Sequence, residues 1–278
     1  MSETLRVACV QNCAGPDMAD NIERAAAQVR EARGQGAELI ALPEHFTCLD
    51  IGRGGVETGA LPTDEHPALP RFADLARETV AWLLLGSVAI REGERQHNRS
   101  YLVNDSGEIV THYDKIHLFD IDLGKGESYR ESDKVIPGEQ AVVTATPWGK
   151  MGLTVCYDLR FAYLYRALAQ AGAGILTCPA AFTRTTGRAH WHTLVRARAI
   201  ETGSFLIAPC QSGKHGERYT YGHSLIVDPW GEILAEGADE AEEVIVADLD
   251  LARVAQVRSR LPALQHDRPF VGPESTGQ

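Results

Sequence analysis

Three chemically reactive side chains follow predicted strands in this sequence. Cys156 comes directly after residues 152–155 in KMGLTVCYDLRF, Glu44 follows the apolar stretch of LIALPEHF, and Lys115 lies in HYDKIHLFD. A thiol can attack a carbonyl carbon, a carboxylate can take the thiol proton, and an ammonium can stabilise the negative oxygen that forms. Each residue alone has an ordinary alternative: a packed core cysteine, a solvated loop acid and a surface lysine. Together they predict a cysteine-dependent amide hydrolase.

The sequence around Cys156 indicates a sharp transition from a strand to an amphipathic helix. The backbone N–H groups of a first helical turn have no partner within the helix and can receive an anion. We therefore expect a lowered pKa for the Cys156 thiol and an oxyanion site beside it. Burial of Glu44 at a strand end is expected to raise its pKa toward neutrality, which suits a general base.

The composition excludes several classes of function. The 278 residues carry a formal net charge of −11, from 27 Lys+Arg and 38 Asp+Glu, which gives no basic field for nucleic acid. The N-terminal MSETLRVACVQ lacks the pattern of a signal peptide, and no apolar stretch approaches the roughly 20 residues that span a bilayer. We expect a soluble cytoplasmic protein without a membrane partner. Its six cysteines are then expected to be reduced thiols.

The sequence predicts no metal and no cofactor. The nearest approach to a metal motif is the pair His190 and His192, which flank Trp191 in a predicted helix. Neighbouring helical positions of this kind point to different sides, so the pair is not expected to chelate an ion.

Apolar runs of strand length alternate with amphipathic runs of helix length, and this pattern predicts an α/β fold. The predicted strands and hairpins cover residues 5–11, 36–46, 81–90, 99–118, 150–158, 175–182, 204–211 and 222–236. The predicted helices cover residues 18–36, 68–80, 163–174 and 189–203.

The order of elements repeats once, in halves of about 4–115 and 150–250, followed by a tail from about 262. GAELIALPEHF matches GAGILTCPAAF, which sets Glu44 opposite Ala180, and the same alignment sets Cys156 opposite Gln11. We expect one domain over residues 1–278, in which each half gives one sheet and helices lie outside, as a four-layer α-β-β-α sandwich. Because active residues of α/β folds lie just past strand ends, Glu44, Lys115 and Cys156 are expected to meet on one rim.

Three ordered motifs, LPEHF, HYDKIHLFD and LTVCYDLRF, resemble the Glu, Lys and Cys signatures of the nitrilase (carbon–nitrogen hydrolase) superfamily. The resemblance extends from RVACVQ to LPALQHDRP. It implies the same sandwich fold, Cys156 as nucleophile, Glu44 as general base, Lys115 as stabiliser or proton donor, and a thioester intermediate. It also implies a second glutamate near the site, which we assign to Glu131 in YRESDK, with Glu127 as the alternative.

Within that superfamily the chain is most similar to the deaminated glutathione amidase branch, through CQSGKHGERYTYGHSLIVDPWGE and LPALQHDRP. The resemblance implies cleavage of deaminated glutathione to 2-oxoglutarate and cysteinylglycine. The alternatives are an ω-amidase acting on 2-oxoglutaramate or 2-oxosuccinamate, another small aliphatic amidase, and a catalytically silent scaffold of the same fold.

A substrate that carries carboxylates needs a cation to bind it. Arg160 lies shortly after the nucleophile, and Arg184 follows the second matched strand, so both are candidates. Phe182 and Thr183 are expected to line the pocket, and the backbone N–H of Tyr157 is expected to hold the oxyanion.

The resemblance also implies a homodimer joined through the helices after the nucleophile. Tyr163, Tyr165 and Trp191 lie on those predicted helices. They fit an interface between two copies, and a place in the core is an equal explanation.

Overall fold

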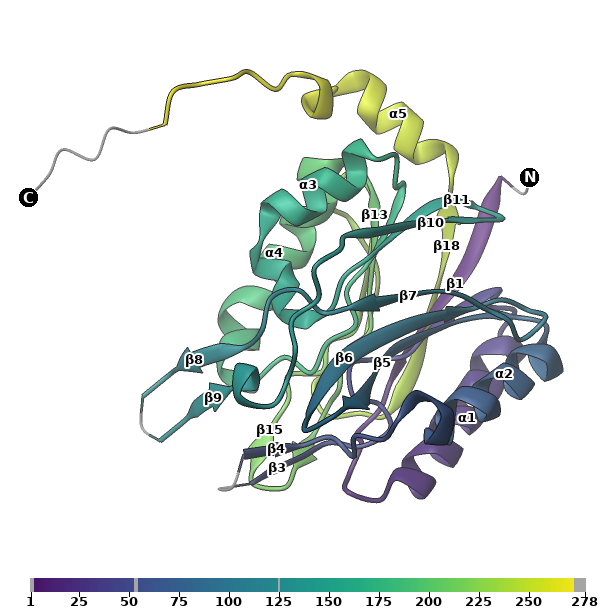
Figure 1. Cartoon of the computed structure of the whole chain (residues 1–278). Coiled ribbons are helices and arrows are strands. Elements are labelled where there is room, and N and C mark those ends of the chain that lie inside the picture. Colours follow the sequence, from purple (N-terminus) through teal and green to yellow (C-terminus); the bar gives the residue numbers. More distant parts are fainter. Residues whose placement is uncertain (1–2, 53–54, 125, 273–278) are drawn as a thin grey trace, which may run out of the picture.

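The chain folds around two six-stranded β-sheets, which the computed structural model describes for residues 3–52, 55–124 and 126–272 (Figure 1). The first sheet has the order β18-β1-β2-β5-β6-β7. Its strands are β1 (Thr4–Gln11), β2 (Leu39–Ala41), β5 (Trp82–Glu92), β6 (Arg95–Val103), β7 (Ile109–Asp114) and β18 (Glu243–Asp250). Strands β1, β2 and β5 run parallel, and the others pair antiparallel.

The second sheet repeats this pattern of directions, in the order β10-β11-β12-β13-β16-β17. Here β11, β12 and β13 are the parallel strands, with antiparallel neighbours on both sides. The strands are β10 (Val142–Thr146), β11 (Gly149–Leu153), β12 (Ile175–Thr177), β13 (Phe205–Ala208), β16 (Leu225–Val227) and β17 (Ile233–Glu236).

Helices cover the outer faces of the two sheets, so the predicted four-layer α-β-β-α sandwich is confirmed (Figure 1). The first sheet carries α1 (Met18–Gly34) and α2 (Ala68–Thr79), and the second carries α3 (Ala162–Gln170) and α4 (Arg184–Thr202). An additional helix, α5 (Ala252–Arg260), follows β18. Short 3-10 turns span Thr63–Glu65, Glu131–Asp133, Cys156–Arg160 and Ala263–Gln265.

The alternation of side chains along β1 shows how the layers are held together. Val7 and Cys9 pack in the core between the sheets, whereas Ala8 and Val10 pack under α1 and α2. Successive strand residues point to opposite faces, so a strand covered on both sides is apolar throughout. This is why LRVACVQ has a continuous apolar run and still belongs to a two-sided sheet.

The boundary between the predicted halves differs from the boundary between the sheets. Strand β18 comes from the second half of the sequence but pairs antiparallel with β1 along the whole strand, from Thr4↔Asp250 to Gln11↔Glu243. Strand β10 comes from the segment between the halves and joins the second sheet. Both additions give the first parallel strand of a sheet an antiparallel neighbour, which satisfies backbone groups at a sheet edge.

Three small hairpins gather at one end of the sandwich (Figure 1). They are β3 (Asp50–Gly52) with β4 (Gly55–Glu57), β8 (Asp120–Asp122) with β9 (Ser128–Arg130), and β14 (Lys214–His215) with β15 (Arg218–Tyr219). The Glu217 N–H donates to the Ile51 carbonyl at 2.8 Å, which joins the third hairpin to the first. The sequence pattern did not predict these hairpins because their strands are too short to show a period.

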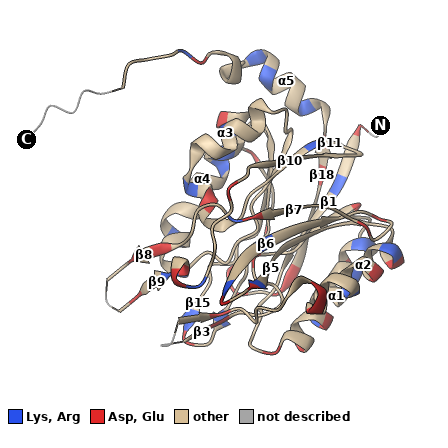
Figure 2. Cartoon of the chain, viewed as in Figure 1, with Lys and Arg blue, Asp and Glu red and all other residues tan. Residues whose placement is uncertain are grey.

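Charged residues of both signs are interspersed over α1 and α2, as Figure 2 shows. Among the described residues, no helix is both long enough and apolar enough to cross a membrane.

Candidate active site

Cys156 begins the 3-10 turn that follows β11, and the residue is 7% exposed. Its φ is +50°, in the left-handed region that residues other than glycine rarely adopt. The Cys156 N–H donates to the Pro179 carbonyl at 2.8 Å, which ties the turn to the segment after β12. The predicted elbow is therefore present, although α3 begins only at Ala162. In this turn the Asp158 N–H also donates to a carbonyl, that of Val155 at 3.1 Å.

Glu44 lies three residues past the end of β2, on a segment that crosses β5 very closely. A Cβ on Gly86 would lie 1.9 Å from the Leu42 carbonyl oxygen and 2.4 Å from that of Pro43, so only glycine fits there. The Gln211 side chain donates to the Glu44 carbonyl at 3.0 Å. These contacts fix the backbone from which the Glu44 side chain enters the site.

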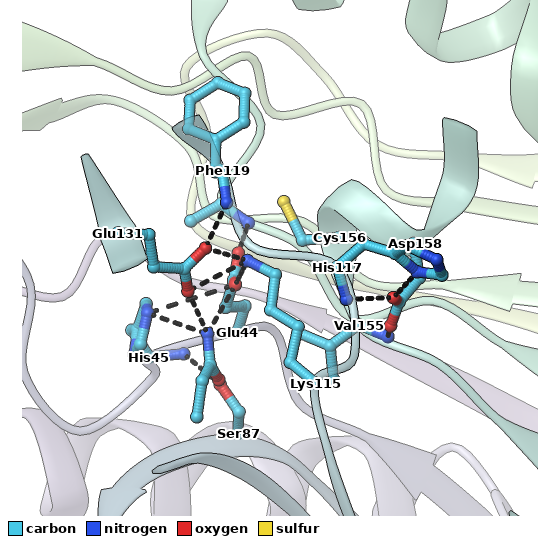
Figure 3. Close-up of polar contacts among 12 residues, drawn as sticks. Glu44, His45, Ser87, Lys115, His117, Phe119, Glu131, Val155, Cys156 and Asp158 are labelled. Carbon is cyan, nitrogen blue, oxygen red and sulfur yellow. Dashed lines mark hydrogen bonds and ion pairs between the residues drawn. The ribbon is translucent and has the colours of Figure 1, made fainter. Parts of the chain in front are cut away.

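Lys115 follows β7, and its ammonium lies between two carboxylates (Figure 3). Its Nζ is 2.9 Å from Glu44 Oε1 and 2.8 Å from Glu131 Oε2. The other oxygen of Glu44 accepts the Ala181 N–H at 2.8 Å, and Glu131 Oε2 also accepts the Phe119 N–H at 2.6 Å. The structure thus brings Glu44, Lys115 and Glu131 together around one buried cation.

Burial and charge act in opposite directions on the ionisation of this group. Burial disfavours the charged forms of Lys115 and Glu44, but attraction between opposite charges prevails. The pKa of Lys115 is raised well above its ordinary value, and the pKa of Glu44 is lowered to about 2. Burial, followed by the charge of Glu44, raises the pKa of Cys156 well above its ordinary value.

Both pKa directions predicted from the sequence are therefore wrong. The prediction for Glu44 considered burial without a lysine ammonium 2.9 Å away. The prediction for Cys156 considered the turn without the burial of the thiol, which is the larger cause, and without the neighbouring Glu44 carboxylate. The resting site consequently holds a protonated thiol beside an ionised Glu44. The thiol proton therefore passes to Glu44 while the sulfur attacks the substrate, and not before.

Asn98, on β6, is a site residue that the sequence analysis missed. Its Nδ2 lies 2.9 Å from Glu44 Oε1, 3.1 Å from Glu131 Oε1 and 3.2 Å from His45 Nε2. Its backbone carbonyl accepts the Lys115 N–H at 3.0 Å. An asparagine is unusual at a buried strand position, and that signal could have identified it.

Asp158 was also missed, and it links the Lys115 segment to the Cys156 turn. Its buried carboxylate accepts the Val155 N–H at 2.9 Å and the Tyr113 hydroxyl at 2.7 Å. It also accepts the His117 N–H at 3.0 Å and contacts His117 Nδ1 at 2.7 Å. Val155 directly precedes the nucleophile, and Tyr113 and His117 lie two residues on either side of Lys115. The Asp158 carboxylate therefore fixes the Cys156 turn and the Lys115 segment relative to each other (Figure 3).

A cavity of about 510 Å³ opens onto these residues. Glu44, Lys115, Glu131 and Cys156 line it, together with residues of all three small hairpins. The predicted binding residues Tyr157, Phe182 and Thr183 line it as well. Its size lies within the ~300–1,000 Å³ typical of small-molecule sites.

Arg160 does not line the cavity, but it contacts two residues that do. Its guanidinium carbon lies 5.6 Å from the ring centre of Tyr157 and 5.4 Å from that of Phe182. It also contacts His190 Nδ1, at 3.3 Å from Nη1. Arg160 thus packs against two aromatic residues of the cavity lining without lining the cavity itself.

Arg184 and Glu127 lie apart from the reactive group. Arg184 begins α4, forms ion pairs with Asp239 and Glu240, and does not line the cavity. Glu127 accepts a hydrogen bond from the Thr185 hydroxyl at 3.0 Å. Among the described residues, the acid that contacts Lys115 alongside Glu44 is thus Glu131, the first of the two alternatives.

Ligand atoms of Glu44, His45 and Glu131 lie within 4.8 Å of one another. This set resembles a metal site in its donors, yet the Lys115 ammonium already lies against both carboxylates. A metal cation bound there would be repelled by the positive charge of the Lys115 ammonium.

Comparisons with known proteins agree with this geometry. The sequence model of the carbon-nitrogen hydrolase family matches residues 6–259. The deaminated glutathione amidase of Homo sapiens is 42% identical over 271 residues, which cover 95% of this chain and 82% of that protein. The deaminated glutathione amidase of Yersinia enterocolitica is 38% identical over 267 residues, covering 94% of this chain and 92% of that protein.

Solved structures show the same fold. The Nit3 protein of Saccharomyces cerevisiae, a member of branch 10 of the nitrilase superfamily, superposes with a TM-score of 0.83 at 29% identity, covering 96% of this chain and 97% of Nit3. The C. elegans NitFhit protein gives 0.86 at 30% identity, covering 95% of this chain and 65% of that longer protein. This chain, with its buried cysteine, glutamate and lysine, therefore belongs to the carbon–nitrogen hydrolase family and is an amidase.

Proposed function

We propose that this amidase hydrolyses deaminated glutathione through a thioester on Cys156. The observation that carries the proposal is the Lys115 ammonium, held between Glu44 and Glu131 beside a buried thiol at a substrate-sized cavity. An amide carbon that reaches the thiol would have a base and an oxyanion partner within the same group.

The reaction proceeds in two stages, each through a tetrahedral intermediate. Glu44 takes the thiol proton as Cys156 Sγ bonds to the amide carbon, and the carbonyl electron pair moves to oxygen. Lys115 and the Tyr157 N–H stabilise that oxygen. The carbon–nitrogen bond then breaks, and the leaving amine of cysteinylglycine receives the proton from Glu44. Water attacks the thioester, gives its proton to Glu44, and releases 2-oxoglutarate as the thiol is restored.

Glu131 and Asn98 position the groups that act on the substrate. Glu131 binds Lys115 with both oxygens, at 2.8 and 3.1 Å, and turns the ammonium toward the cavity. Asn98 links the carboxylates of Glu44 and Glu131. Preorganised charges of this kind stabilise a transition state without further rearrangement.

Two further observations support this substrate. Relatives that cover most of the chain are named deaminated glutathione amidases. The cavity extends beyond the reactive group to the three hairpins, which leaves space for a tripeptide-sized molecule on both sides of its scissile amide. In a glutamate-to-leucine mutant of the amidase from Nesterenkonia sp., the acetamide moiety of fluoroacetamide is covalently added at the active-site cysteine, which supports covalent chemistry at Cys156.

The substrate carries a carboxylate at each end, and two arginines are suited to bind them. Arg160 remains our prediction for one end: it does not line the cavity, but its guanidinium carbon lies 5.6 Å and 5.4 Å from the ring centres of Tyr157 and Phe182, which do. Arg218 lines the cavity from the third hairpin, and its guanidinium also donates to the Gly126 carbonyl at 2.6 Å. We assign Arg218 to the end farther from the thiol.

We also propose a cytoplasmic homodimer. Six free cysteines among the described residues support a reducing compartment. Tyr163 is 66% exposed on α3 and supports an interface there, whereas Tyr165 and Trp191 are core residues of a single copy. Sedimentation at micromolar concentration tests the dimer, and a monomer profile would contradict it.

The substrate and the mechanism can be tested separately. We expect kcat/KM for deaminated glutathione to exceed that for 2-oxoglutaramate by more than about tenfold. The reverse preference would identify an ω-amidase instead. We expect Cys156→Ala to abolish activity while Cys13→Ala, which changes a cysteine outside the site, retains it. Full activity in Cys156→Ala would overturn the mechanism. Mass spectrometry of rapidly quenched wild-type enzyme should detect one 2-oxoglutaryl group on Cys156.

A further inference from the structure

A second cluster of chemically capable side chains lies outside the cavity. His192 on α4, His223 just before β16 and Glu236 at the end of β17 bring their ligand atoms within 4.8 Å of one another. His192 Nε2 and His223 Nδ1 each lie 2.9 Å from the same oxygen, Glu236 Oε1. None of the three lines the catalytic cavity.

We propose that His192, His223 and Glu236 form a binding site for a divalent transition-metal ion of the zinc class. Two imidazole nitrogens and one carboxylate oxygen are a common donor set for zinc, with a water as fourth ligand. The three side chains are 22 to 39% exposed, so an ion and its water can reach them from solvent.

The distances from the two histidines to Glu236 suit this role with small adjustments, and the two imidazole nitrogens lie within 4.8 Å of one another. Zinc–nitrogen bonds of about 2.0–2.1 Å in a tetrahedral site separate the ligand atoms by roughly 3.3 Å. The two 2.9 Å contacts would therefore lengthen by a few tenths of an ångström. Each imidazole would keep its proton on the ring nitrogen that faces away from the metal, so both rings bind as neutral ligands.

The surroundings hold the two histidines in place without a metal. The His223 backbone has a φ of +51°, and its carbonyl accepts the Trp191 indole N–H at 2.7 Å. The Tyr221 ring packs 4.5 Å from the ring of His223 and 5.8 Å from that of His192, measured between ring centres. Ligands already oriented in this way lose little freedom when an ion binds.

This cluster differs from the similar donor set in the active site. There, the Lys115 ammonium already lies against both Glu44 and Glu131 and occupies the place that an ion would take. At Glu236 the partners are two histidines, which are neutral ligands once unprotonated. The carboxylate therefore keeps a net negative charge that attracts a cation.

The test uses the full chain, freed of any affinity tag and treated with a chelator, and titrates it with zinc chloride by calorimetry. We expect one site in the wild type, and affinity weakened by at least about tenfold in His192→Gln and in Glu236→Gln. His112→Ala, which changes an exposed histidine far from the cluster, is the matched control and should bind as the wild type does. Equal affinity in wild type and His192→Gln would overturn the proposal.

A second measurement locates the ion independently of affinity and of amidase activity. Anomalous X-ray diffraction at the zinc edge, from crystals soaked in zinc, should give a peak between His192, His223 and Glu236. A peak at a cysteine or in the catalytic cavity, with none at the cluster, would refute the assignment. Zinc should also raise the Tm of the wild type by several degrees, and the Tm of Glu236→Gln much less, because binding to the folded state stabilises it.

Discussion

Asp158→Asn tests whether one buried carboxylate aligns the nucleophile with the lysine. Asp158 accepts hydrogen bonds from Val155, Tyr113 and His117, each at 2.7 to 3.0 Å. Asparagine has the same shape but replaces one acceptor oxygen with an NH₂ donor. If its oxygen faces His117, the new NH₂ faces the Val155 N–H, and neither donor has an acceptor.

The expected loss of stability in Asp158→Asn follows from the buried donor that is left without an acceptor. A buried donor without an acceptor costs about 1–3 kcal/mol, so we expect the free energy of unfolding to fall by roughly 2 kcal/mol. Val155 precedes Cys156, so the thiol should shift relative to Lys115. Misplacement of about 1 Å can reduce a rate by roughly 100-fold, and we expect kcat to fall 10- to 100-fold with little change in KM.

A matched control separates alignment from general stability. Asp228, in the β16–β17 turn, is another buried aspartate with donors at both oxygens: Oδ1 accepts the Trp230 and Glu232 N–H groups, both at 2.8 Å, and Oδ2 accepts from Arg253 Nε at 3.2 Å. Asp228→Asn should lower the unfolding free energy to a similar extent and retain kcat. Steady-state kinetics and denaturant unfolding on both variants check this. A kcat in Asp158→Asn equal to that of Asp228→Asn would refute the alignment role.

Three further predictions concern packing, pH and specificity. Gly86→Ala should lower the free energy of unfolding by at least about 3 kcal/mol and abolish activity, because its methyl group would overlap the backbone next to Glu44. Gly34→Ala is the control: Gly34 has open space around it, so this variant should keep both its stability and its activity. Urea unfolding and amidase assays on both variants measure these effects. Because the pKa of Glu44 is lowered in the folded state, its stabilisation is present above about pH 4.3 and is lost as pH falls toward pH 2. The difference in unfolding free energy between wild type and Glu44→Gln should thus be constant from pH 5 to 7 and shrink below pH 4; a constant difference down to pH 3 would contradict the Lys115 ion pair. Arg218→Ala should raise KM for deaminated glutathione about tenfold. It should leave KM for 2-oxoglutaramate nearly unchanged, because that substrate lacks the distal carboxylate. Equal effects on both KM values would show that Arg218 does not bind that carboxylate.

The residues predicted from the sequence were those whose motifs, LPEHF, HYDKIHLFD and LTVCYDLRF, together resemble the carbon–nitrogen hydrolase family. Glu44 and Lys115 follow strands of the first sheet, Cys156 follows a strand of the second, and all three residues line one cavity. The sandwich followed from the repeat and from the alternating elements. These features depend on short stretches of sequence, so they could be predicted without coordinates.

The features that were missed depend on pairings between distant segments. The pKa directions depend on Lys115 and Glu44, which are 71 positions apart in the chain but 2.9 Å apart in space. From the neighbouring sequence, Asp158 is predicted only as part of the start of a helix. Its hydrogen-bond partners lie 41 and 45 positions earlier in the chain, so no local pattern indicates them. The small hairpins that line the cavity have strands of two or three residues, too short for a period to appear.

The pairing of β1 with β18 bears on how the protein is made. Glu44, Lys115 and Cys156 all leave the ribosome before residue 243, yet the sheet that carries Glu44 and Lys115 lacks its edge partner until β18 emerges. Until then the eight residues of β1 present unpaired backbone groups and apolar side chains on both faces. During synthesis this edge is the part of the chain most exposed to wrong pairing with another strand. The last strand of the fold therefore protects the first, and a nascent chain that stalls before residue 243 is expected to be a substrate for chaperones.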